Sequence, residues 1–88
     1  MSMPKQKRLL GELKMRASQV LELEGEFRKK LINIAATKNP ASVYGLAQAT
    51  SVNHGHTFTE ADELARAARW LAIIRRDYGE QKFKKVIS

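Results

Sequence analysis

The chain has 88 residues, of which 43 % are apolar, and it has no cysteine, a formal net charge of +7 and a pI near 10.1. This length predicts a single domain over residues 1–88 with a thin stability margin, because chains of this size bury only about 60 to 65 % of their unfolded surface. The composition excludes an intrinsically disordered chain, disulfides, thiolate metal sites, a membrane-spanning helix and a signal peptide, so we expect a soluble cytoplasmic protein.

The first predicted element is a long helical region over residues 4–37. Its apolar side chains recur at alternating steps of three and four, a heptad seam made of Leu10, Leu13, Ala17, Val20, Phe27, Leu31 and Ile34 and interrupted by Glu24. Gly25 is a natural breaking point, since glycine costs about 1 kcal/mol relative to alanine inside a helix. The region therefore either forms two helices that fold on each other around Gly25, or one long helix that pairs with its copy in a homodimer.

A short helix is predicted over residues 40–50. Pro40 suits the first helical position, and Asn39 before it suits the N-cap. An uncharged connector then leads to the next helix.

Residues 46–53 also resemble the first helix and turn of a helix-turn-helix unit. Ala47 stands at the close-packed alanine position and Val52 stands in the turn. The match weakens afterwards, because Ser51 replaces the preferred glycine and Gly55 lies where the recognition helix should begin.

The central helix is predicted over residues 60–78. Thr59 is the expected N-cap, with Asp62 as the acid three residues later, and Gly79 is expected to end the helix. Its apolar positions span more than one ordinary face, which predicts packing against two neighbours: Ala61, Leu64, Ala65, Ala67, Ala68, Trp70, Leu71, Ala72, Ile74 and Tyr78.

Residues 80–88 form a basic tail that either docks through Phe83, Val86 and Ile87 or remains mobile. Together, these elements predict an all-α fold, a small bundle of three or four helices with a long or kinked N-terminal region.

No pattern in the sequence points to catalysis, a cofactor or a metal. Motifs for nucleophilic or phosphate-loop chemistry are missing, so we expect a protein that is not an enzyme. His54 and His56 could supply two metal ligands, but structural zinc needs four, and a polar turn is the simpler interpretation. The aromatic residues lie mostly at apolar helix positions and are expected in the core rather than stacked on bases.

Basic residues are the main indication of function. A chain with this charge is attracted to polyanions, and arginines on a rigid helix suit bidentate phosphate contacts. The candidate binding residues are Arg66, Arg69, Arg75, Arg76, Lys82, Lys84, Lys85, Lys5, Lys7 and Arg8.

We therefore expect a non-enzymatic nucleic-acid-binding protein, a regulator or architectural accessory that contacts phosphates of duplex DNA or structured RNA. The alternative is a protein-interaction module, an inhibitor or adaptor that docks its seam or its basic face on an acidic partner protein. Attachment of the basic N-terminus to a membrane surface is the weaker third alternative, because the seam continues beyond that segment and favours burial.

Overall fold

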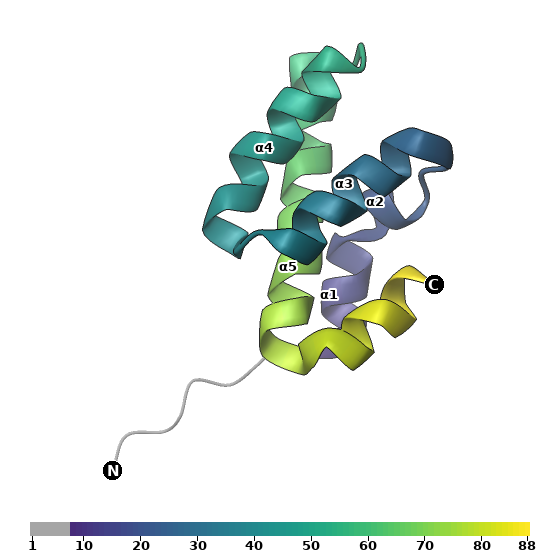
Figure 1. Cartoon of the computed structure of the whole chain (residues 1–88), viewed down its shortest axis with the longest axis vertical. Coiled ribbons are helices and arrows are strands. Elements are labelled where there is room, and N and C mark those ends of the chain that lie inside the picture. The colour runs from purple at the N-terminus through teal and green to yellow at the C-terminus, as the bar shows by residue number, and fades with distance from the viewer. Residues whose placement is uncertain (1–7) are drawn as a thin grey trace.

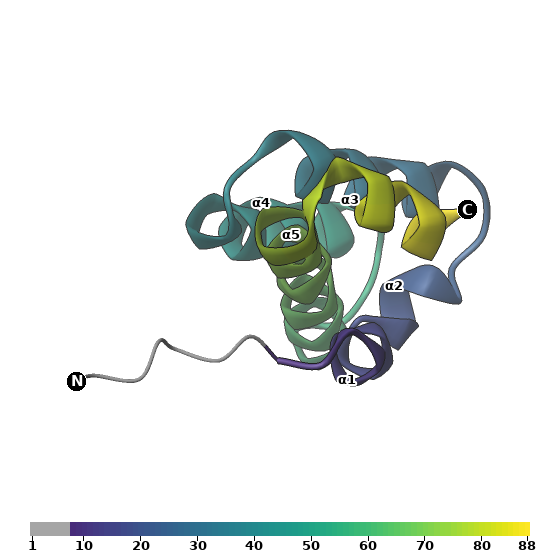
Figure 2. The same ribbon diagram turned by 90° about the horizontal axis from the view of Figure 1, so that it is seen from below.

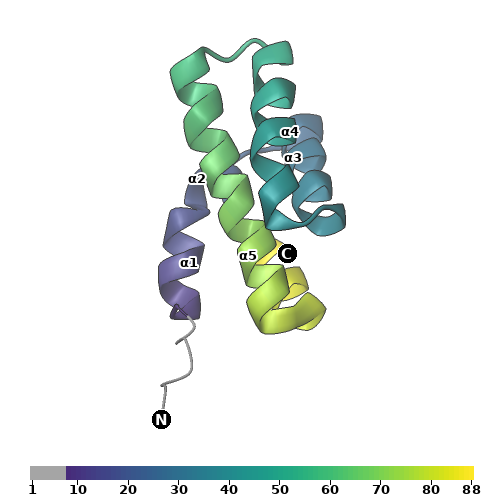
Figure 3. The same cartoon turned by 90° about the vertical axis from the view of Figure 1, so that its left-hand side faces the viewer.

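The computed structural model describes residues 8–88 and confirms the all-α fold. Five helical segments follow in chain order, one or two more than predicted: α1 (Leu10–Arg16), α2 (Ser18–Leu21), α3 (Gly25–Thr37), α4 (Pro40–Asn53) and α5 (Phe58–Ile87). Helix α5 runs through the middle of the bundle (Figure 1), with α1 and α2 on one side and α3 and α4 on the other (Figure 2, Figure 3). Within residues 8–88, no helix combines the length and the apolar character needed to cross a membrane.

The N-terminal helical region is broken rather than continuous. Helices α1 and α2 meet at Ala17, and the chain then turns over residues 22–24 before α3 begins at Gly25, whose φ is +73°. Glu24, the acidic residue on the seam, is exposed at this turn. The alternative of one long helix over residues 4–37 is therefore wrong. The chain turns at Glu24, whose carboxylate would be buried if the helix continued along the seam. The predicted start of the region, residues 4–7, lies outside the described residues.

Most of the apolar side chains of the heptad seam are buried inside the bundle. Leu13, Val20 and Leu31 are fully buried, and Phe27 is nearly so. They pack with the apolar face of α5, where the predicted wide face is confirmed by the burial of Ala61, Leu64, Ala65, Ala67, Ala68, Leu71, Ala72 and Ile74. The break thus lets two halves of one seam cover the same central helix.

Helix α4 begins as predicted and ends later. The Ser42 N–H donates to Asn39 Oδ1 at 3.1 Å, which makes Asn39 the N-cap before Pro40. The helix continues through Asn53, and Ser51 is buried with its hydroxyl donating to the Ala47 carbonyl. The helix-turn-helix interpretation is wrong, because its predicted turn is helical and α4 and α5 lie side by side as an antiparallel pair (Figure 3).

Helix α5 starts at Phe58, two residues earlier than predicted. Thr57 is the N-cap: its side chain accepts from the Glu60 N–H at 3.1 Å, while Glu60 Oε1 accepts from the Thr57 N–H at 2.8 Å. The predicted Thr59 cap is wrong. Thr57 and Glu60 form the complete capping box, in which the longer glutamate side chain reaches back to the N-cap backbone. These hydrogen bonds also hold the pKa of Glu60 below its ordinary value.

Gly79 ends the helix that begins at Phe58, as predicted, and α5 consists of two helices joined across a kink at this residue. With φ +90° and ψ 170° it interrupts the helical geometry, and residues 80–87 continue as helix in a new direction (Figure 1). Phe83 is only 2 % exposed, so the tail docks on the bundle. Arg28 holds the end of the tail by donating to the Ile87 carbonyl at 2.9 Å.

Candidate functional site

Three helices bring arginine and aromatic side chains together around a surface groove of about 500 Å³. Arg16 comes from α1, Tyr44 from α4, and Arg66, Arg69 and Trp70 from α5. We call this the arginine groove. The three residues of α5 are neighbours on one helix face because their spacing is three and four.

A second groove of about 320 Å³ adjoins the first, since both are lined by Arg16, Arg66 and Trp70. Its other walls include Met15 and Glu63. Met15 is one of the exposed large apolar side chains of the protein. Together, the two grooves form a continuous surface that passes Trp70 and joins α1 to α5.

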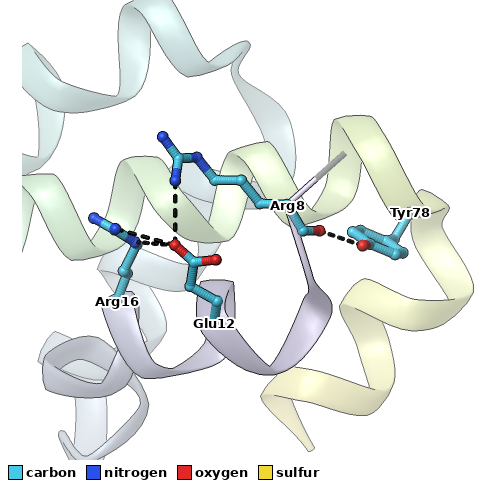
Figure 4. A network of polar contacts seen from close by, with 4 residues as sticks. All are labelled: Arg8, Glu12, Arg16 and Tyr78. Carbon is cyan, nitrogen blue, oxygen red and sulfur yellow. Dashed lines mark hydrogen bonds and ion pairs between the residues drawn. The ribbon is translucent and has the colours of Figure 1, made fainter. Parts of the chain in front are cut away.

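The cations beside Trp70 are held by one carboxylate (Figure 4). Glu12 Oε1 lies 3.2 Å from Arg8 Nη1 and 3.1 Å from Arg16 Nη2. The two guanidinium carbons lie 5.3 Å and 5.0 Å from the centroid of the Trp70 ring, within the range of a cation–π contact. The Tyr78 hydroxyl donates to the Arg8 carbonyl and fixes the backbone just before α1. These contacts orient both arginines toward the indole.

A second carboxylate, that of Asp62, contacts two of the residues that line the groove. Asp62 Oδ1 accepts from the Tyr44 hydroxyl, and Asp62 Oδ2 lies 3.1 Å from Arg66 Nε. The hydrogen bond to Asp62, followed by burial and the carboxylate charge, raises the pKa of Tyr44 above its ordinary value. Arg69 makes no side-chain hydrogen bond or ion pair with any residue in the described part of the chain.

The charge of the arginine groove is strongly positive. Its lining, within residues 8–88, contains three arginines and no carboxylate. The Arg66 side chain is 70 % exposed even though it pairs with Asp62. The pair with Asp62 uses Arg66 Nε, so the terminal N–H groups of Arg66 can donate to an incoming anion while the pair is kept. The groove therefore suits an anionic ligand.

Arg75 has a different position from the other predicted binding residues. Its guanidinium donates to the carbonyls of Ala35 and Lys38 at 3.1 and 2.9 Å, and it pairs with Glu80 at 3.1 Å. It therefore caps the end of α3 and joins it to the chain after the Gly79 bend. These partners use three of the five N–H donors of Arg75, and Arg75 does not line the arginine groove.

The remaining predicted binding residues are spread over the molecule. Arg76 pairs with Asp77 at 2.9 Å, and that hydrogen bond raises the pKa of Arg76. Lys82, Lys84 and Lys85 are exposed on the segment beyond the bend and do not line the arginine groove. Lys5 and Lys7 lie outside the described residues. The structure thus brings Arg66 and Arg69 together in the arginine groove and places Arg8 over the Trp70 ring next to them, whereas the lysines of the tail lie elsewhere.

The two histidines of the connector pack on an aromatic ring. His54 and His56 stack on Phe27 with ring centroids 4.3 Å and 4.9 Å away. His56 Nδ1 also lies 3.7 Å from Glu60 Oε1. In the described part of the chain, no cluster of three or more histidine or acidic side chains could hold a metal ion. The stacking gives both histidines a structural place between α3 and the α4–α5 connector.

Comparisons with protein-family models, with curated proteins and with solved structures found no match. The geometry of the chain is therefore the only basis for the function proposed below.

Sequence reasoning missed the aromatic part of the site. Phe27 and Phe83 are buried as expected, whereas Tyr44 and Trp70 are half-buried and line the groove. Arg16 is part of the groove; sequence reasoning counted it among the basic residues of the N-terminus but gave it no place in the shorter list of binding residues. The available signal was the spacing of Arg66, Arg69 and Trp70, which places the indole at the border between the apolar and basic faces of one helix.

Proposed function

We propose that the protein is a non-enzymatic nucleic-acid-binding protein whose contact surface is the arginine groove and its surroundings. The observation that supports this most directly is the convergence of Arg16, Arg66 and Arg69 from two helices on one groove that has no carboxylate in its described lining. The net charge of +7 adds a long-range attraction for polyanions. A regulator or architectural accessory would use such a surface without any chemical step.

Arginine suits this role better than lysine would. Its planar guanidinium offers paired donors that match two oxygens of a phosphate, and a helix holds the side chains at fixed spacing. Trp70 helps further, because its ring keeps Arg16 on the groove side of α1. The alternative, an adaptor for an acidic protein, loses one of its two surfaces because the heptad seam is buried in the bundle.

The test is the salt dependence of binding to a labelled oligonucleotide, measured by fluorescence anisotropy. Each phosphate contact adds roughly 0.7 to 0.9 to the slope of log affinity against log salt. We expect the double variant Arg66→Ala/Arg69→Ala to bind more weakly and to reduce this slope by about one per arginine removed.

A charge-matched control separates a local contact from general attraction. Lys84→Ala/Lys85→Ala removes the same charge from the segment beyond the Gly79 bend, away from the groove. It should leave the slope close to that of the wild type. Equal effects of the two double variants would reject the groove as the contact surface, and no binding by the wild type at low salt would reject nucleic acid as the partner.

A further inference from the structure

We infer that the arginine groove takes an unpaired nucleotide of a single strand, with the base against Trp70 and Tyr44 and the phosphate on Arg66 and Arg69. This inference rests on the proposed function and specifies its ligand. The sequence alone favoured duplex or structured RNA, because the aromatic residues were expected in the core. The position of Trp70 in the groove reverses that preference.

The first argument is the composition of the groove. A surface that contacts only phosphates needs only cations, yet this groove also has an indole and a phenol in its walls. Aromatic faces next to a basic groove are the usual means of holding unpaired bases, since every base has a π-face that can stack. Arg8 and Arg16 lie over the Trp70 ring, so a base that stacks on the indole takes the place of a guanidinium group there.

The second argument is size and continuity. A groove of about 500 Å³ lies within the range of small-ligand sites, which is roughly 300 to 1,000 Å³. The adjoining groove shares Trp70 and extends toward Met15, so the surface continues on both sides of the indole. A duplex keeps its bases stacked inside and cannot place one in either groove, whereas a single strand can lay consecutive nucleotides along both.

The third argument concerns the polar groups behind the aromatic walls. Asp62 fixes Tyr44 and Arg66 relative to each other, and Glu12 does the same for Arg8 and Arg16. Both carboxylates thus organise the cations before a ligand arrives, which lowers the ordering cost of binding. Arg69 is left with its donors open to a phosphate.

Trp70 is the single tryptophan of the chain, so its intrinsic fluorescence reports on the groove alone. The full chain is titrated with a single-stranded oligonucleotide, a duplex of the same length, inorganic polyphosphate of matched charge and a mononucleotide. We expect saturable quenching by the single strand, and little by the duplex or by polyphosphate at concentrations that bind equally. Quenching by the mononucleotide as strong as by the single strand would overturn the choice of a polymer.

A variant pair tests the same contact without fluorescence. Trp70→Leu removes the aromatic ring but keeps an apolar side chain, and Phe58→Leu removes an aromatic ring that is 77 % exposed at the start of α5. With a labelled single strand, Trp70→Leu should bind roughly five-fold or more weakly, the lower end of what one stacked base contributes, while Phe58→Leu should bind as the wild type does.

The two proposals fail differently. If single strand and duplex bind with equal affinity and steep salt dependence while Trp70 fluorescence stays unchanged, the stacked nucleotide is excluded and the phosphate-contacting surface stands. If none of the polymers binds at low salt, both proposals are wrong. The fluorescence of the wild type decides the question even where Trp70→Leu fails to fold.

Discussion

Replacing Arg75 with alanine should destabilise the fold without weakening nucleic-acid binding. The guanidinium makes two hydrogen bonds to backbone carbonyls, of Ala35 and Lys38, and one ion pair with Glu80. Hydrogen bonds from a charged donor contribute about 1.5 to 3 kcal/mol each when water cannot replace them, and a surface ion pair contributes about 0 to 1 kcal/mol. The side chain is 24 % exposed, so water recovers part of the loss.

We therefore expect Arg75→Ala to lower the free energy of unfolding by about 2 to 3 kcal/mol, which for a domain of this size lowers Tm by about 10 °C or more. Urea unfolding followed by circular dichroism at 222 nm measures the difference. Arg69→Ala is the matched control, because it removes the same side chain from the same helix and breaks no described contact; it should stay within about 0.5 kcal/mol of the wild type.

At a temperature where both variants are folded, Arg75→Ala should bind an oligonucleotide as the wild type does and Arg69→Ala should bind it more weakly. Equal stability of the two variants would refute the structural role of Arg75. Weaker binding by folded Arg75→Ala would place this residue in the contact surface after all.

Two further predictions concern the kink of α5 at Gly79 and its first turn at Glu60. Gly79→Ala should lower the free energy of unfolding by about 1 to 3 kcal/mol, measured by thermal unfolding, because its φ of +90° is strained for any side chain. The control is Gly45→Ala, in the open interior of α4, which should instead raise the free energy of unfolding by about 0.5 to 1 kcal/mol. The same loss of stability at both positions would contradict this account. Because Glu60 has a pKa below its ordinary value of 4.5, its charge stabilises the fold above that pH and the contribution disappears as pH falls through the lowered folded value. The Tm of the wild type should therefore be higher than that of Glu60→Gln at neutral pH, and the difference in Tm should disappear in acid. A difference in Tm that does not change with pH would rule out the charge of Glu60 as its cause.

Local sequence signals predicted the elements whose ends are decided locally. Asn39 and Pro40 start a helix by their own backbone and side-chain chemistry, and the structure places that start where the sequence does. Thr57 and Thr59 are each followed by an acid three residues later, and the choice between them depended on the reach of that acid. The prediction chose Thr59 wrongly, because it did not weigh the longer side chain of Glu60.

Other features depend on contacts between distant segments, which no local pattern contains. Gly79 has the left-handed geometry expected of a helix end, yet the chain resumes a helix because Phe83 finds a buried place on the bundle. Arg69 and Arg75 are the same residue type on one helix, and only the end of α3 beside Arg75 gives them different roles. Trp70 lies between the apolar and the basic face of α5, and it lines a groove only because α1 and α4 supply the other walls.

The contacts of residues 78–87 also bear on the order in which the bundle folds. Arg28 bonds the carbonyl of Ile87, 59 residues away, and the Tyr78 hydroxyl bonds the carbonyl of Arg8, 70 residues away. Contacts between such distant residues close long loops, and that closure costs chain entropy before the contact forms. The two hydrogen bonds are therefore expected to form late in folding, after the local turns of the helices.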